Sequence, residues 1–144
     1  MTKYSTVSKM IFVDTSAFYA LEVEDDINHE KARKFLANEL RKGKYGILIT
    51  SDYVIDETLT LLRIKHSVAA AFKFYEKISK SKSIKTIWVN QEIFEEALKF
   101  FKRNGNLKWS FTDCTSFTIM KLLNIKHAFT FDDNFKQAKY IKLP

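Results

Sequence analysis

Four carboxylates in this sequence stand in otherwise apolar stretches. Asp14 and Asp132 each follow directly on a short apolar run that is typical of a buried strand. Glu57 lies inside a segment with helical apolar spacing, where it cannot act as a cap, and Asp113 lies at the start of another such segment. Carboxylates that are brought together away from water repel one another, so they take up protons or bind a cation. These four residues are the candidates for a chemical site.

The donors available to such a site are oxygens. The three histidines are scattered and Cys114 is the single cysteine, which excludes a structural zinc cluster and a disulfide framework. Oxygen donors alone favour Mg²⁺ or Mn²⁺. Mg²⁺ keeps several waters and suits an open site for a phosphate-bearing substrate, where one or two ions can activate a water and stabilise the leaving oxygen of a phosphodiester.

Apolar runs and helical patterns alternate along the chain. This alternation predicts an α/β fold, a three-layer α/β/α sandwich around a central, mainly parallel sheet. The expected strands are 10–13, 47–50, 84–89, 127–131 and 140–143, and the expected helices are 15–21, 29–42, 53–65, 68–79, 90–103 and 112–123. Neighbouring parallel strands would bring Asp14 and Asp132 to one edge of the sheet. The alternative for Asp14 is simple helix capping, and Thr112 is the expected cap of the helix that contains Asp113.

The length and composition are those of a single globular domain. Of 144 residues, 46% are hydrophobic, which is enough for one core. We expect one domain over residues 10–144, with residues 1–9 as an N-terminal arm or as the result of an alternative start before Met10. The chain has no secretory signal and no apolar run of membrane-spanning length, so a cytoplasmic protein with no membrane contact is expected. The net charge of +7 suits a polyanionic partner.

Four segments, FVDTSAFYAL, DETLTLL, SFTDCTSF and AFTFDDNF, together resemble the acidic motifs of PIN-domain ribonucleases. Their order and spacing are most similar to those of the VapC-like toxins of bacterial and archaeal toxin–antitoxin pairs. The resemblance covers the chain from Met10 onward. It implies a parallel sheet with strand order 3-2-1-4-5 and hydrolysis of RNA by water attack with Mg²⁺ or Mn²⁺.

The resemblance also implies roles for individual positions. Asp14, Glu57, Asp113 and Asp132 match the family's catalytic, metal-binding acids. Four further residues would support these acids. Thr15 and Ser16 match the small polar pair beside the family's first acid, and Ser116 could reach a metal-bound water or a phosphate. Asp133 is either the competitor of Asp132 for the role of fourth acid or a turn-capping residue.

Basic and aromatic residues flank the loop before Asp113. Lys102, Arg103 and Lys108 could contact RNA phosphates, and Trp109 could stack on a base. The alternative is a solvated basic loop with Trp109 packed inward.

The resemblance further implies two protein partners. The third and fourth helices of such toxins commonly form a groove for the antitoxin protein, and the fifth often contributes to a homodimer. The groove residues expected here are Tyr53, Ile55, Leu59, Leu62, Phe72 and Phe74, with core packing as the alternative for most of them.

Two other functions remain open at this point. One is a non-catalytic PIN-like scaffold that binds RNA or protein, with strongly salt-dependent RNA binding and no cleavage. The other is a phosphoryl-transfer protein with an aspartate nucleophile. It is disfavoured because no second acid follows two residues after Asp14.

Overall fold

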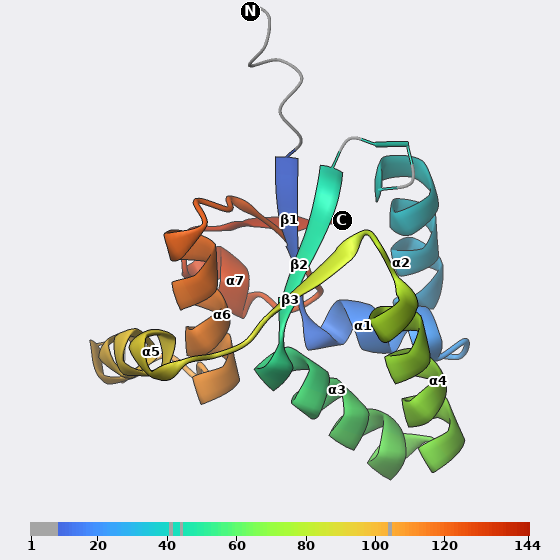
Figure 1. Ribbon diagram of the computed structural model, residues 1–144, viewed down its shortest axis with the longest axis horizontal. Helices are drawn as coiled ribbons and strands as arrows, with labels where there is room; N and C mark the ends of the chain where they lie inside the picture. The colour runs from blue at the N-terminus through green and yellow to red at the C-terminus, as the bar shows by residue number, and fades with distance from the viewer. Residues whose placement is uncertain (1–8, 41, 44, 104) are drawn as a thin grey trace, which may run out of the picture.

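The computed structural model describes residues 9–40, 42–43, 45–103 and 105–144, along which strands and helices alternate (Figure 1). Residues 1–8 of the expected N-terminal arm lie outside the described residues, and Lys9 is already part of the first strand. The elements are β1 Lys9–Val13, α1 Thr15–Glu22, α2 His29–Phe35, the π-helix η2 Leu36–Leu40, β2 Tyr45–Ser51, α3 Asp52–Lys65, α4 Val68–Lys80, β3 Ile84–Ile87, α5 Gln91–Arg103, α6 Phe111–Leu122, β4 His127–Phe129, α7 Asn134–Gln137 and β5 Ile141–Leu143.

The five strands form one sheet in the order β3-β2-β1-β4-β5, and every neighbouring pair is parallel. Strand β1 is central: Phe12 lies opposite Ile49 of β2 and opposite Ala128 of β4. From β1 the chain moves outward to one edge of the sheet through β2 and β3, and from β4 it moves to the opposite edge at β5. The direction of progress along the sheet therefore reverses between β1 and β4. Ligands of open parallel sheets bind in the crevice at such a reversal. The predicted fold and strand order are confirmed.

Helices cover both faces of the sheet. In Figure 1, α1, α2 and α4 lie on one side of it and α6 and α7 on the other. Right-handed crossovers require this arrangement, because connections that progress in opposite directions along a sheet pass over opposite faces. The ends of β1 and β4 therefore meet between helices from both layers.

The core is rich in aromatic rings. Phe117 of α6 packs at 5.0 Å from Phe135 of α7, measured between ring centroids, and Phe135 in turn packs on Phe12 of β1. All three side chains are fully buried. A central parallel strand is covered on both faces, which is why β1 has a continuous apolar run and no alternation.

Strands β4 and β3 and helix α2 end two or more residues earlier than the sequence predicts, and two residues beyond the end of each of these strands a side chain accepts the backbone N–H. Strand β4 stops at Phe129 because the N–H of Phe131 donates to Ser16 Oγ. Strand β3 stops at Ile87, and the N–H of Val89 donates to the Asp52 carboxylate at 2.7 Å. The predicted helix 29–42 is α-helical only to Phe35 and continues as the π-helix η2.

Candidate active site

Asp14 stands at the carboxyl end of β1, in the crevice between β1 and β4. Its backbone N–H donates to the carbonyl of Phe129 at 3.1 Å, which continues the contact between the two strands. Asp14 occupies the N-cap position of α1, yet its side chain makes no capping hydrogen bond to that helix. The capping interpretation is therefore wrong, and the buried carboxylate points elsewhere.

Two hydroxyl groups converge on one oxygen of Asp14. Ser16 Oγ lies 3.2 Å and Thr130 Oγ1 lies 3.0 Å from Asp14 Oδ2, and the two hydroxyl oxygens are 3.1 Å apart. Each hydroxyl also accepts a backbone N–H from the segment after β4: Ser16 from Phe131 and Thr130 from Asp132. The hydroxyl pair thus fixes the first acid and the segment that contains the fourth acid to each other.

The surroundings of Asp14 favour its protonated form. Burial raises the pKa of Asp14 to about 7, and the negative charges of Asp113 and Glu57 add to the increase. Hydrogen bonds from the Thr15 backbone and the Thr130 hydroxyl act in the opposite direction. Three carboxylates from three different elements are therefore close enough to influence one another.

Asp113 is held at the start of α6 by a reciprocal pair of capping bonds. Its backbone N–H donates to Ser110 Oγ at 3.0 Å, and its Oδ2 accepts the Ser110 backbone N–H at 3.1 Å. The predicted cap, Thr112, is wrong, because the helix begins at Phe111 and Ser110 caps it. Burial raises the pKa of Asp113, and the charges of Asp132 and Glu57 raise it further.

Glu57 approaches from α3, on the other side of the crevice. Helix α3 starts at Asp52 because Ser51 Oγ accepts the N–H of Val54 at 3.1 Å. This start places Glu57 in the second turn, half-buried, beside a hollow of about 320 Å³ that Thr112 of α6 also lines. Glu57 therefore lines a hollow that lies between α3 and the start of α6.

Asp132 and Asp133 have different surroundings. Asp132 lies close enough to Asp113 to raise its pKa, and its Oδ1 accepts the backbone N–H of Asn134 at 2.9 Å. Asp133 is exposed and forms an ion pair with Lys142 at 2.7 Å, which lowers the pKa of Asp133. The geometry therefore places Asp132 with the other acids, while Asp133 faces β5.

Sequence reasoning missed two residues at this site, Thr130 and Asn134. The Asn134 side-chain amide donates to Asp113 Oδ2 at 2.9 Å and lies 3.5 Å from Asp132 Oδ2. Thr130 could have been noticed as the polar residue within the apolar run AFTF. Asn134 carries no comparable signal, because its contacts join segments that are distant in the sequence.

The hydroxyl groups of Thr15 and Ser116 donate to backbone carbonyls and not to the acids. The Thr15 hydroxyl donates to the Val54 carbonyl at 3.5 Å and so links α1 to α3. Ser116 is fully buried, and its hydroxyl donates to the carbonyl of Thr112 one turn earlier in α6. This placement differs from the predicted reach of Ser116 toward a metal-bound water or a phosphate.

The basic residues of the predicted RNA-binding set are exposed. Lys102, Arg103 and Lys108 lie at or after the end of α5, and the Arg103 guanidinium lies 5.0 Å from the Phe100 ring. Trp109 is half-buried: its ring packs edge-on against Phe117 at 5.0 Å. The packing interpretation accounts for the Trp109 ring in this structure.

The donor chemistry of the site fits a hard divalent cation, since Asp14, Glu57, Asp113 and Asp132 supply only oxygens. Within the described ranges, however, no three Asp, Glu, His or Cys side chains lie close enough to surround one ion. Asp113 and Asp132 each accept hydrogen bonds from the segments around them. Binding a cation would require these carboxylates to turn toward one another.

Comparison with known proteins identifies the family. The family model of the PIN domain matches residues 11–140. The chain belongs to the PIN-domain family. This PIN domain is 33% identical over 136 residues to the 23S rRNA-specific endonuclease VapC20 of Mycobacterium tuberculosis, which covers 93% of this chain and 98% of VapC20. It is 30% identical over 124 residues to a VapC ribonuclease of Archaeoglobus fulgidus, covering 85% of this chain and 77% of the relative.

A solved structure has the same fold. The crystal structure of Mycobacterium tuberculosis VapC20, described as a sarcin–ricin loop cleaving toxin, matches this PIN domain with a TM-score of 0.83 and 31% identity. The match covers 91% of this chain and 96% of that chain. The resemblance inferred from the four acidic motifs is thereby confirmed. Among the described residues, no helix is long and apolar enough to cross a membrane.

Proposed function

We propose that this PIN domain is an endoribonuclease and the toxin of a toxin–antitoxin pair. The observation that supports this best is the approach of Asp14, Asp113 and Glu57 from three different elements. Burial and the charges of Asp113 and Glu57 raise the pKa of Asp14, and burial and the charge of Glu57 raise the pKa of Asp113. Buried carboxylates with strongly raised pKa values are typical of functional sites. The names of the two relatives, an endonuclease and a ribonuclease, support the same reaction class.

Asp14, Glu57, Asp113 and Asp132 are the proposed ligands of one or two Mg²⁺ or Mn²⁺ ions. When bound, such a cation lowers the pKa of a water and neutralises charge on the scissile phosphate. Ser16 and Thr130 orient the Asp14 carboxylate through Oδ2. Ser110 orients Asp113 through its backbone N–H. These contacts hold the two carboxylates in defined positions at the edge of the sheet.

The proposed substrate is a structured RNA, with a ribosomal RNA loop as the first candidate. VapC20 is specific for 23S rRNA and cleaves the sarcin–ricin loop, according to its names. The net charge of +7 suits a polyanion, and the side chains of Lys102, Arg103, Lys108 and Lys136 are exposed. Action on ribosomes would place the protein in the cytoplasm.

A cleavage assay tests the proposal. Purified protein is incubated with intact ribosomes and with total RNA at low salt, with Mn²⁺, Mg²⁺ or EDTA. We expect discrete cuts that require the cation and are absent from Asp14→Asn. Asp133→Asn is the matched control, since Asp133 pairs with Lys142 outside the acid cluster. If the wild type binds Mn²⁺ and RNA but leaves every RNA intact, the non-catalytic scaffold is the better description.

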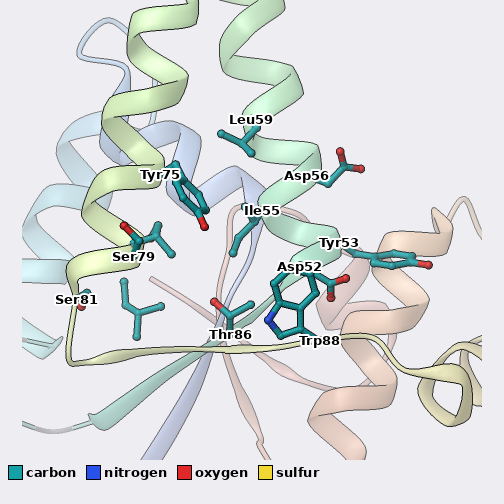
Figure 2. A pocket seen from close by; sticks show the side chains of 12 residues that line it. Asp52, Tyr53, Ile55, Asp56, Leu59, Tyr75, Ser79, Ser81, Thr86 and Trp88 are labelled. Carbon is teal, nitrogen blue, oxygen red and sulfur yellow. The ribbon is translucent and has the colours of Figure 1, made fainter.

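The groove between α3, α4 and β3 is the proposed site of the antitoxin. It has a volume of about 650 Å³ and combines apolar walls with the carboxylates of Asp52 and Asp56. Figure 2 shows Tyr75 of α4 facing Ile55 of α3, with Trp88 beside Asp52 at the end of the groove. These features suit an amphipathic segment with basic residues at its edge.

The residues of this surface differ partly from those that the sequence predicts. Leu62 and Phe74 are fully buried core residues, whereas Phe72 is 66% and Trp88 is 72% exposed. A pull-down with the neighbouring gene product, compared between wild type, Trp88→Ala and Ile27→Ala, tests the surface. Ile27 is also exposed but lies outside the groove. We expect only Trp88→Ala to weaken binding, and equal binding by all three proteins would contradict the assignment.

An apolar stripe on α5 is the proposed homodimer surface. Phe94, Leu98 and Phe101 follow one another at helical spacing and are 39–49% exposed. Phe111 extends the stripe toward α3, since its ring lies 4.8 Å from that of Phe94. Light scattering after gel filtration should find a dimer for the wild type and for Ile27→Glu, and a monomer for Leu98→Glu. A monomeric wild type would contradict this surface.

A further inference from the structure

Helix α7 and the loop 105–110 are joined by two side-chain contacts. The Asn134 amide nitrogen lies 3.4 Å from the carbonyl oxygen of Lys108, to which it donates. Trp109 Nε1 donates to Gln137 Oε1 at 3.3 Å. Both contacts connect the segment after the fourth acid with the loop that contains the exposed Lys108.

Asn134 differs from Gln137 because it also contacts the acids. Its amide donates to Asp113 Oδ2 at 2.9 Å and lies 3.5 Å from Asp132 Oδ2. An amide NH₂ has two hydrogens, so these three acceptors depend on one planar group. A change in the position of Asp113 or Asp132 therefore reorients the Asn134 amide, which also donates to the Lys108 carbonyl.

Ser110, the last residue of the loop, contacts Asp113 directly through the capping bonds, whereas the contacts of Trp109 do not involve the acids. The Trp109 ring packs on Phe117, and its indole nitrogen donates to the side-chain oxygen of Gln137. Gln137 thus provides an internal comparison: it contacts the same loop from the same helix without contacting an acid.

We propose that Asn134 is a positioning residue that makes the placement of Lys108, and of residues 105–109 around it, depend on the state of the acidic cluster. This inference rests on the proposed cation-dependent ribonuclease. Carboxylates fixed by a cation hold the Asn134 amide, and the amide holds the Lys108 carbonyl. Lys108 is then presented to the RNA backbone in a fixed relation to the acids. Because coupling between two binding sites is reciprocal, RNA bound at the loop also favours cation binding.

Cation binding and loop order can be measured without any RNA. Mn²⁺ is titrated by calorimetry, and hydrogen exchange of residues 105–109 is followed with and without saturating Mn²⁺; Ser110 is left out because its N–H donates directly to Asp113. In the wild type we expect Mn²⁺ to slow exchange in the loop. In Asn134→Leu, which keeps the side-chain size and removes the amide, we expect about 10-fold weaker Mn²⁺ binding and no response of the loop at saturation. Asn134→Ser serves as a second variant if Asn134→Leu folds poorly.

Gln137→Leu is the matched control. It should speed exchange around Trp109 but leave Mn²⁺ affinity and the Mn²⁺ response of Lys108 unchanged. In a Trp88→Phe background, Trp109 is the only tryptophan, so its fluorescence gives the same comparison by a second method. Wild-type Mn²⁺ affinity in Asn134→Leu, or an unchanged loop response in that variant, would overturn the inference.

The steady-state constants separate this inference from the proposed function. If the protein cleaves RNA, Asn134→Leu should raise KM and lower kcat, whereas Gln137→Leu should raise KM alone. A wild type that cleaves no RNA but shows the Mn²⁺ response of the loop contradicts the proposed function and leaves the coupling intact. A wild type that cleaves RNA with no such response contradicts the coupling alone.

Discussion

Thr130 Oγ1 lies 3.0 Å from Asp14 Oδ2, although the two residues are 116 positions apart in the chain. The same hydroxyl accepts the backbone N–H of Asp132 at 3.0 Å. A single oxygen atom therefore contacts both the first acid and the backbone of the fourth. This hydroxyl therefore fixes the position of the Asp14 carboxylate relative to the backbone at Asp132.

Removing this hydroxyl should weaken the site without unfolding the protein. Thr130→Val keeps the shape of the side chain, and loss of a hydrogen bond to a metal-binding carboxylate typically costs about 10- to 100-fold in affinity or activity. Calorimetric Mn²⁺ titration and RNA cleavage should both show this loss, and Thr130→Ser should restore most of it.

Thr118→Val is the matched control for Thr130→Val, because Thr118 is equally buried and its hydroxyl donates within α6, to Cys114. Equal effects of the two substitutions on Mn²⁺ binding would mean that a general packing change, and not the contact with Asp14, is responsible.

The cation-free protein should become less stable as the pH rises from about 4 to 8. The pKa of Asp14 is raised from 3.8 in the unfolded chain to about 7 in the folded protein. Between these values the folded state binds more protons than the unfolded state, so the free energy of unfolding falls with increasing pH. The stabilising contribution of Asp14 is complete below the pKa that this residue has in the unfolded chain, and it is lost as the pH passes through the pKa that it has in the folded protein. Urea unfolding in EDTA at several pH values measures it.

Asp14→Asn provides the comparison for this pH dependence. The amide cannot ionise, and its oxygen can still accept from Ser16 and Thr130. We expect the variant to be more stable than the wild type at pH 8 without a cation and similar at pH 4. Mn²⁺ should stabilise only the wild type. A wild type whose stability is flat over this pH range would contradict the raised pKa.

Removing the serine N-caps of α6 and α4 should lower the stability of the protein equally but affect RNA cleavage differently. Ser110 caps α6 beside Asp113, and Ser67 caps α4 with a similar bond of 3.0 Å to the N–H of Ala70. Each substitution to alanine should cost about 1 kcal/mol. Only Ser110→Ala should also lower the cleavage rate, because Asp113 loses one of its two capping bonds. Urea unfolding and cleavage rates measured on the same samples test this. A similar loss of activity in Ser67→Ala would indicate that activity follows stability alone.

The ring of Phe117 should be essential for stability. It is fully buried and packs against Trp109, Phe135, Phe100 and Tyr140. Phe117→Ala should lower the free energy of unfolding by about 3–5 kcal/mol, the typical effect of a buried phenylalanine cavity. Phe72→Ala, at an exposed ring of the same size, should change it by less than about 1 kcal/mol. Denaturant unfolding of the two variants makes the comparison, and a small effect at Phe117 would contradict the central role of this aromatic cluster.

The sequence predicts the main features of the fold because local patterns determine them. The run before Asp14 is apolar without alternation, as is typical of a central parallel strand. The strand ends at Val13, directly before Asp14, as the sequence predicts. Glu57 could be placed inside a helix because the apolar spacing around it continues on both sides. The choice between Asp132 and Asp133 could not be made, since the proximity of Asp132 to Asp113 and the ion pair of Asp133 with Lys142 both depend on residues distant in the sequence.

The missed features depend on contacts between distant segments. Thr112 is an acceptable cap by residue type, but Ser110 forms the reciprocal pair with Asp113. Strand β4 ends before Thr130 because the backbone that follows it bonds to Ser16, 115 residues earlier. Asn134 follows two aspartates and reads as an ordinary turn residue, and its role becomes visible only when the segments 108–113 and 132–134 are side by side.

The position of β1 at the centre of the sheet has a consequence for synthesis on the ribosome. Strand β1 is translated first, and its neighbour β2 follows soon after, but β4, which contains its other partner residues, is translated more than 110 residues later. Asp14 therefore has no Thr130, Asp132 or Asn134 beside it while most of the chain is being made. A nascent chain of this kind has an incomplete acidic cluster, so the ribosome that is translating it is not exposed to an assembled nuclease.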